Sequence, residues 1–162
     1  MAHDDEKTLW DKGQLRKARY KALRGTRQLR DNERALVEII QSLDSNYENL
    51  VVIVEGKRDE RVLRELGLRA PIVRTQTGKS REQFIKHLIS EIGENGQVLI
   101  LTDFDEEGET LQSFIERELE LERARVLRRV RGEIGRVMGN FSCIEELVAL
   151  FKRRDSPEPR FQ

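Results

Sequence analysis

"LVVIV", residues 50–54, is the stretch that decides the fold class of this chain. Its five apolar residues follow one another without alternation, and four of them are β-branched. A run of this kind is typical of a strand that is buried on both faces, and such strands occur in parallel sheets covered by helices. We therefore expect a parallel sheet with helices on both sides.

Three further apolar runs lie downstream, with room for a helix between each pair. They are residues 71–75, "PIVRT", residues 98–101, "VLIL", and the more exposed residues 124–127, "ARVL". Strands that alternate with helices form doubly wound α/β domains. The sequence predicts an α/β fold with a doubly wound, mostly parallel four-stranded sheet and an N-terminal helical extension.

The predicted sheet domain is flanked by polar and basic segments. We assign residues 1–47 to a basic helical arm, residues 48–152 to the sheet domain and residues 153–162 to a polar tail. Within the arm, the apolar spacing from Leu36 to Leu43 predicts an amphipathic helix where the packed core begins.

Local signals predict where several helices begin and end. Ser80 and Gln83 form a capping-box pair that opens one helix. Gly67 is expected to end another helix. Gly96 is expected to end the turn that precedes the third strand. Ser142, with Glu145 three residues on, predicts a last helix near the C-terminus.

Composition excludes several classes of protein. No stretch approaches the ~20 apolar residues that cross a bilayer, and the acidic N-terminus has no apolar run of a secretion signal. A single cysteine, Cys143, rules out an internal disulfide, and its apolar neighbour Ile144 favours a buried thiol. We expect a soluble cytoplasmic protein without a membrane partner.

Charge is segregated along the chain although the formal net charge is zero. Residues 12–34 carry nine Lys or Arg against two acids, and residues 103–122 carry nine acids against one Arg. The basic arm predicts contacts with nucleic-acid phosphates, with Trp10 and Tyr20 available for stacking; a solvated tail or a protein-binding segment is the alternative. The expected phosphate-binding residues of the arm are Arg16, Lys17, Arg19, Lys21 and Arg24.

Acidic residues follow two of the predicted strands. Glu55 comes directly after the first strand, and Asp103 and Asp105 come after the third. Neighbouring parallel strands lie ~4.8 Å apart, so carboxylates at two such ends can converge on one site. If the third strand continues, Asp103 and Asp105 point the same way, because side chains alternate. Carboxylate oxygens suit hard cations, so we expect a site for Mg²⁺, with Mn²⁺ as a substitute.

Two glycines accompany these acids, and a less specific explanation exists for part of the cluster. Gly56 and Gly108 are expected to let the backbone turn sharply beside the metal. A solvated acidic loop at the start of a helix would explain Glu106, Glu107 and Glu109, because acids favour helix N-termini. It does not explain a second Glu-Gly pair at another strand end.

Other segments are candidates for phosphate contacts. "TQTGKS", residues 75–80, lacks the first glycine of a P-loop, since that position is Val73. Thr77 and Lys79 are still candidates to hold a nucleic-acid phosphate, the alternative being a simple helix cap by Ser80. Lys57 is expected at a phosphate or at a solvated helix start. Residues 125–131, "RVLRRVR", fit an exposed edge strand or a nucleic-acid contact.

Two motifs resemble those of the Toprim family of topoisomerases, bacterial-type primases, recombination mediators and certain nucleases. "VVIVEGKRDERVL", residues 51–63, resembles the family's first motif, with Glu55 at its acid. "LTDFDEEGE", residues 101–109, resembles the second, with Asp103 and Asp105 at its paired aspartates and Glu107 where some members carry a further acid. The resemblance covers roughly residues 49–150 and implies a Rossmann-like fold.

The resemblance also implies a function. Family members perform Mg²⁺-dependent phosphodiester chemistry. The resemblance implies that Glu55 acts as general acid or base, and that Asp103 and Asp105, assisted by Glu107, bind the metal. In the alternative assignment Glu55 is also a metal ligand. Tyr20 and Tyr47 lie outside the matched part, which argues against a topoisomerase, and one cysteine with two histidines cannot form a primase zinc domain.

We expect a Mg²⁺-dependent nuclease acting on structured RNA or on DNA, as in ribosomal-RNA maturation. The alternatives are a non-catalytic nucleic-acid-binding or complex-forming module of the recombination-mediator type, joined to a protein partner through the arm, and primase-like nucleotidyl transfer.

Overall fold

The computed structural model describes the backbone of residues 27–139 and the side chains of residues 31–139. The chain divides into two compact units, Met1–Ala35 and Leu36–Gln162. Helix α2 (Arg27–Asn46) begins in the first unit and continues into the second. The five predicted phosphate-binding residues of the arm, the helix predicted at Ser142, Cys143 and the polar tail lie outside the described residues.

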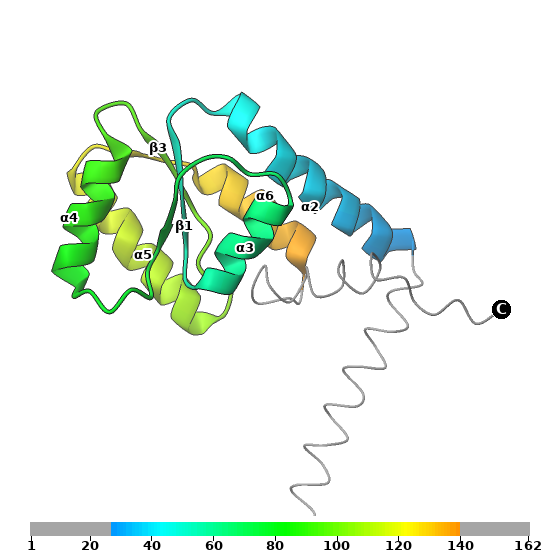
Figure 1. Ribbon diagram of the computed structural model, residues 1–162. Coiled ribbons are helices and arrows are strands. Elements are labelled where there is room, and N and C mark those ends of the chain that lie inside the picture. Colours follow the sequence, from blue (N-terminus) through cyan, green and yellow to red (C-terminus); the bar gives the residue numbers. More distant parts are fainter. Residues whose placement is uncertain (1–26, 140–162) are drawn as a thin grey trace, which may run out of the picture. The chain divides into compact units, whose positions relative to one another are not determined.

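A parallel four-stranded sheet forms the centre of the second unit (Figure 1). Its strand order is β2-β1-β3-β4, and every neighbouring pair is parallel. This arrangement confirms the predicted α/β fold class. The strands are β1 (Leu50–Val54), β2 (Ile72–Arg74), β3 (Gln97–Ile100) and β4 (Arg125–Val126).

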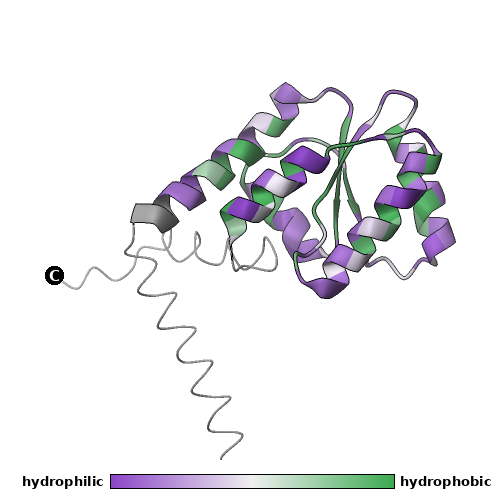
Figure 2. Cartoon of the chain, turned by 180° about the vertical axis from the view of Figure 1, so that it is seen from behind, coloured by the Kyte–Doolittle hydropathy of each residue, from purple (hydrophilic) through white to green (hydrophobic). Residues whose placement is uncertain are grey.

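Helices cover both faces of this sheet, as the unbroken burial of β1 requires. Helices α4 (Arg81–Ile92) and α5 (Glu106–Leu121) lie on one face, and α3 (Lys57–Glu65) and α6 (Arg128–Met138) lie on the other (Figure 1). Figure 2 shows the hydrophobic strands between helices with hydrophilic outer surfaces. The core on the first face includes Val51, Ile53, Phe84, Leu88, Ile115 and Leu119.

The topology creates a crevice between β1 and β3. These strands are neighbours, but α3 leaves β1 on one face of the sheet and α5 leaves β3 on the other. Their chains therefore diverge at the carboxyl ends, and ligands of doubly wound proteins bind at such switch points. Glu55 follows β1 directly, and Asp103 lies three residues beyond the end of β3. The fold thus brings the two predicted acidic segments to one place.

The structure confirms the local signals that fall within the described residues. Gln83 N–H donates to Ser80 Oγ and Ser80 N–H donates to Gln83 Oε1, each at 3.2 Å, so the predicted capping box is present. Gly67 has φ +101 just beyond α3, as expected of a helix stop. Gly96 lies between the turn at residues 94–95 and β3, as predicted, and Gly93, with φ +67, ends α4.

No helix within residues 27–139 is long and apolar enough to cross a membrane.

Asp44 provides a test of the packing in the second unit. Its carboxylate accepts the N–H groups of Arg69 and Ala70, at 2.8 and 2.9 Å, and so ties the segment before β2 to α2. Asp44→Ala should lower the free energy of unfolding by about 1–3 kcal/mol, because two backbone donors lose a charged acceptor. Urea denaturation measures this; Glu38→Ala, an exposed position on the same helix, is the control. Equal stability of the two variants would contradict the assigned role.

Candidate functional site

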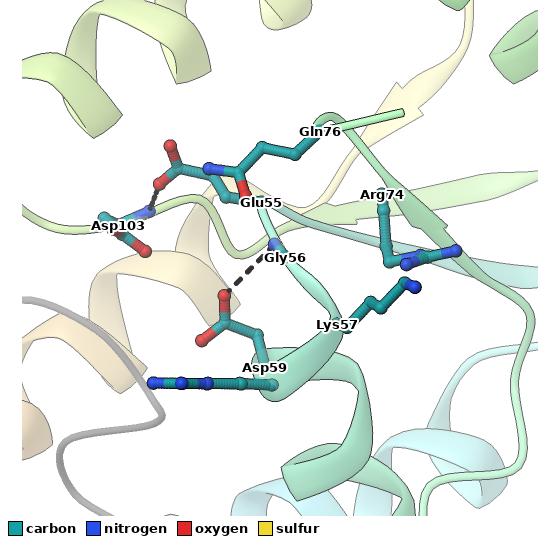
Figure 3. Close-up of a pocket in the computed structure, with 8 residues that line it drawn as sticks. Glu55, Gly56, Lys57, Asp59, Arg74, Gln76 and Asp103 are labelled. Atoms are coloured by element: carbon teal, nitrogen blue, oxygen red, sulfur yellow. Dashed lines mark hydrogen bonds between the residues drawn. The ribbon is translucent and has the colours of Figure 1, made fainter. Parts of the chain in front are cut away.

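A pocket of about 430 Å³ opens at the switch point of the sheet (Figure 3). It is formed by the end of β1, the first turn of α3, the end of β2 and the segment after β3. In Figure 3, Glu55 and Asp103 occupy one side of the pocket, and Lys57 and Arg74 occupy the other. The lining residues are Glu55, Gly56, Lys57, Arg58, Asp59, Arg74, Gln76 and Asp103.

Glu55 and Asp103 are joined by a short hydrogen bond. The backbone N–H of Asp103 donates to Glu55 Oε2 at 2.6 Å, across a sequence separation of 48 residues. Just before it, Leu101 N–H donates to Ile53 O at 2.7 Å, which extends the pairing of the two segments beyond Ile100. The sequence prediction that the acids of these two segments converge is therefore confirmed for Glu55 and Asp103.

The electrostatics of this pair are unfavourable to full ionisation. Burial, together with the nearby carboxylates of Glu55, Asp59 and Asp105, raises the pKa of Asp103 from 3.8 to about 7. Desolvation and like charges both disfavour the ionised form. The acidic side of the pocket, formed by Glu55, Asp59 and Asp103, therefore holds a local repulsion that a bound cation would offset.

Asp59 is a third pocket carboxylate, which the sequence interpretation did not single out. It is 7% exposed, and its Oδ2 accepts the N–H of Gly56 at 3.4 Å, at the start of α3. An acid in the first turn of a helix is a common feature of helix N-termini, so the sequence alone gives Asp59 no special role. Its position facing Glu55 and Asp103 follows only from the three-dimensional fold.

Asp105 and Glu107 take different positions from those predicted. Strand β3 ends at Ile100 and does not continue through Asp103 and Asp105. The alternation of side chains along a strand therefore does not orient these two aspartates. Asp105 is instead the N-cap of α5, where its Oδ1 accepts the N–H of Gly108 at 2.8 Å. Asp105 and Glu107 are exposed and do not line the pocket.

Among residues 31–139 no group of three or more acidic, histidine or cysteine side chains is arranged to hold a metal ion. The pair Glu55 and Asp103 nevertheless fits the chemistry of Mg²⁺, which is usually bound through one or two carboxylates and completes its shell with water and substrate phosphates. The two carboxylate-bearing residues brought together in one pocket support this fit, because a divalent cation would relieve the repulsion between acids that adds to burial in raising the pKa of Asp103.

Of the two glycines beside these acids, Gly56 lies in the bend between β1 and α3, whereas Gly108 is helical, so the prediction of a turn is wrong for Gly108. Gly56 has φ −130 and ψ 174, an extended conformation open to any residue. Gly108 lies within the first turn of α5, and a Cβ there would stand 2.0 Å from the carbonyl oxygen of Asp103. Gly108 is therefore needed for the close approach of α5 to the Asp103 backbone.

The predicted phosphate contacts are only partly brought to the pocket. Lys57, the first residue of α3, lines it, together with Arg58 and Arg74, which had not been predicted. Arg74 also forms an ion pair with Glu60, with Nε and Oε2 3.2 Å apart. Thr77 and Lys79 are exposed beyond β2 and outside the lining, where the cap by Ser80 is the observed feature.

The edge-strand interpretation of the segment 125–131 is confirmed only for its first two residues. Its strand is only Arg125–Val126, at the edge of the sheet, and α6 begins at Arg128. Arg128 pairs with Glu116 and Glu120 of α5. Arg131 is buried beneath the segment that carries Asp103.

The fold and the site define a class: a doubly wound α/β protein with carboxylates gathered at the switch point of its sheet. The chain belongs to the UPF0292 protein family. It is 38% identical over 122 residues to a UPF0292 protein of Thermococcus onnurineus, which covers 75% of this chain and 86% of the relative. It is 31% identical over 119 residues to one of Methanocaldococcus jannaschii, which covers 72% of this chain and 87% of that relative.

One solved structure, of a protein from Aquifex aeolicus, shares the fold. It superposes with a TM-score of 0.56 at 25% sequence identity, and the match covers 67% of this chain and 94% of that chain. No family model matches the chain. These names state no activity.

Asp103 gives a pH-dependent test of the site. Because its folded-state pKa of about 7 exceeds 3.8, the folded state holds the proton more tightly, and stability is lost as pH rises between these values. In metal-free buffer with a chelator, Asp103→Asn should therefore melt a few degrees above the wild type at pH 8, with a smaller gain at pH 5. Thermal melts at several pH values measure this difference.

Glu106→Gln is the matched control, since Glu106 is an exposed carboxylate on the first turn of α5. A gain for Asp103→Asn that does not grow with pH would show that Asp103 carries no electrostatic strain.

Proposed function

We propose that this protein is a Toprim-type enzyme that carries out Mg²⁺-dependent phosphodiester cleavage on nucleic acid, structured RNA or DNA, in the cytoplasm. The observation that carries the proposal is the Glu55 carboxylate held on the Asp103 backbone at 2.6 Å, at the switch point and in a pocket that cations also line. Carboxylates that could hold a metal and basic side chains that could bind phosphates thus line the same pocket. The sequence motifs around Glu55 and Asp103 add the resemblance to Toprim enzymes.

The two acids take different roles in this proposal. Glu55 has one oxygen fixed by the Asp103 N–H, which orients its carboxylate for proton transfer as a general acid or base. Asp103 and Glu55 would hold Mg²⁺, with Asp105 and Glu107 reaching it only if the start of α5 moves. When bound, the ion would polarise the scissile phosphate and offset charge on the leaving oxygen.

The basic side of the pocket supports a polyanionic substrate. Lys57 and Arg58 are exposed on the first turn of α3, and Arg74 is half-buried at the end of β2. Cations placed next to a carboxylate pair would bind phosphates that flank the scissile one, while the acids exclude a phosphate until a metal is present. Substrate and metal would then bind cooperatively.

A second candidate is a nucleic-acid-binding or complex-forming module without catalysis. It is favoured by the lack, within residues 31–139, of a preformed group of three metal-ligating side chains. A binding module needs the basic lining of the pocket but does not need Glu55 to transfer a proton.

Replacing Glu55 separates these candidates. Glu55→Gln keeps an oxygen that can accept the Asp103 N–H, so the segment after β3 should stay in place while proton transfer is lost. Single-turnover cleavage of mixed RNA and DNA substrates should slow by ~10²–10⁴ even at saturating Mg²⁺, because the amide cannot exchange a proton. Glu106→Gln, an exposed acid outside the pocket, should cleave as the wild type does.

Full recovery of the Glu55→Gln rate at high Mg²⁺ would make Glu55 a metal ligand without a role in proton transfer. A wild type that binds nucleic acid but cleaves none of the substrates would favour the binding module.

The basic arm gives a separate prediction. Removing residues 1–26, which stops before α2, should weaken nucleic-acid binding and flatten its salt dependence. Each lost phosphate contact should lower the slope of log K against log salt by about 0.7–0.9. Fluorescence anisotropy at several salt concentrations measures the slope, and removal of residues 153–162 is the control. Identical slopes with and without the arm would assign it to a protein partner.

A further inference from the structure

Arg131 on α6 is a buried cation directly behind the acidic pocket. It is 7% exposed and does not line the pocket, so it is not available to a substrate. Burying a charge is costly unless hydrogen bonds and opposite charges compensate it. The contacts of Arg131 therefore indicate the structural role of its buried guanidinium.

The guanidinium binds the segment that leads from β3 to α5 at successive points. Nη1 donates to the carbonyl oxygens of Ile100 at 2.9 Å and of Thr102 at 3.0 Å. Nη2 donates to the carbonyl oxygen of Asp103 at 3.3 Å and to Glu109 Oε1 at 3.2 Å. One side chain thus holds the end of the strand, the backbone of Asp103 and the first turn of the next helix.

Phe104 fastens the same segment to α6. Its ring centroid lies 4.3 Å from the guanidinium carbon of Arg131, a cation–π contact. The ring also packs over Gly135, one helical turn further along α6, where a Cβ would come within 3.0 Å of it. The backbone before and after Asp103 is therefore held by contacts with α6.

We propose that Arg131 is the positioning residue of the site: it holds the Asp103 backbone so that the Asp103 carboxylate and the Glu55 carboxylate face one divalent cation. This role rests on the proposed function. The planar guanidinium reaches several carbonyl groups at once, which a lysine ammonium cannot do, so the geometry of Arg131 matters as well as its charge. Groups that orient metal ligands commonly affect metal affinity by 10–100-fold.

The test compares Arg131→Lys with the control Ile134→Val. Ile134 is fully buried on the same helix, and its truncation weakens the packing of α6 without removing a contact to the Asp103 segment described above. Phe104→Leu is a second variant, which loosens the segment and leaves the buried charge in place. All three are studied below their melting temperatures.

Three measurements follow on each protein. Amide exchange by NMR in metal-free buffer reports on the Asp103 N–H, Mn²⁺ titration reports on the metal alone, and steady-state cleavage separates kcat from KM. Arg131→Lys should speed exchange of the Asp103 amide, raise the Mn²⁺ dissociation constant at least about tenfold and lower kcat at similar KM. Phe104→Leu should change the same quantities less, and Ile134→Val should change none of them.

The outcomes separate this role from the proposed function. If the wild type neither binds Mn²⁺ nor cleaves nucleic acid, the proposed function is wrong, and the role of Arg131 at a metal site is wrong with it. If the wild type is active but Arg131→Lys matches it in amide exchange, Mn²⁺ affinity and kcat, the positioning role alone is wrong. Losses in Arg131→Lys that Ile134→Val reproduces would reduce Arg131 to a general stabiliser of α6.

Discussion

The structure depends on keeping several carboxylates together at the carboxyl end of a parallel sheet. Glu55, Asp59 and Asp103 face one pocket, and their repulsion, added to burial, raises the pKa of Asp103 to about 7. The parallel pairing of β1 and β3 fixes where the two segments end, and the Asp103 N–H fixes Glu55. This cost is understandable in a site that binds a cation, because strain of this kind is concentrated where function requires it.

Two features outside the pocket make this arrangement possible. Arg131 supplies a resident positive charge behind the acids, with burial lowering the pKa of its guanidinium and Glu109, Glu55 and Asp103 acting in the opposite direction. Gly108 lets α5 approach the Asp103 backbone where any side chain would collide. Arg131 thus offsets part of the negative charge of the acidic segment after β3, and a bound cation would offset more of it.

The sequence allowed the fold and the central pair of acids to be predicted, because both follow from local patterns. Strand β1 matches its predicted bounds, since five unbroken apolar residues define it. The condition for a common orientation of Asp103 and Asp105 is not met, because β3 ends at Ile100 and the Asp105 carboxylate caps α5 instead. Asp59 looked like an ordinary acid at a helix start.

Arg131 was not recognised because its partners lie 22 to 31 residues away, at positions that only the docking of α6 beneath β3 brings together. In the sequence it is one of several arginines in a basic stretch. Such a residue can be found from sequence only when the helix and its packing face are already known.

A crystal structure of the protein grown with Mn²⁺ tests the central claim most directly, because the anomalous signal of the metal locates it without reference to activity. We expect an anomalous peak between the carboxylates of Glu55 and Asp103, with water or phosphate completing the coordination shell and the Arg131 contacts unchanged. A fully ordered pocket without such a peak, at Mn²⁺ concentrations that fill exposed acidic sites elsewhere on the molecule, would contradict the account.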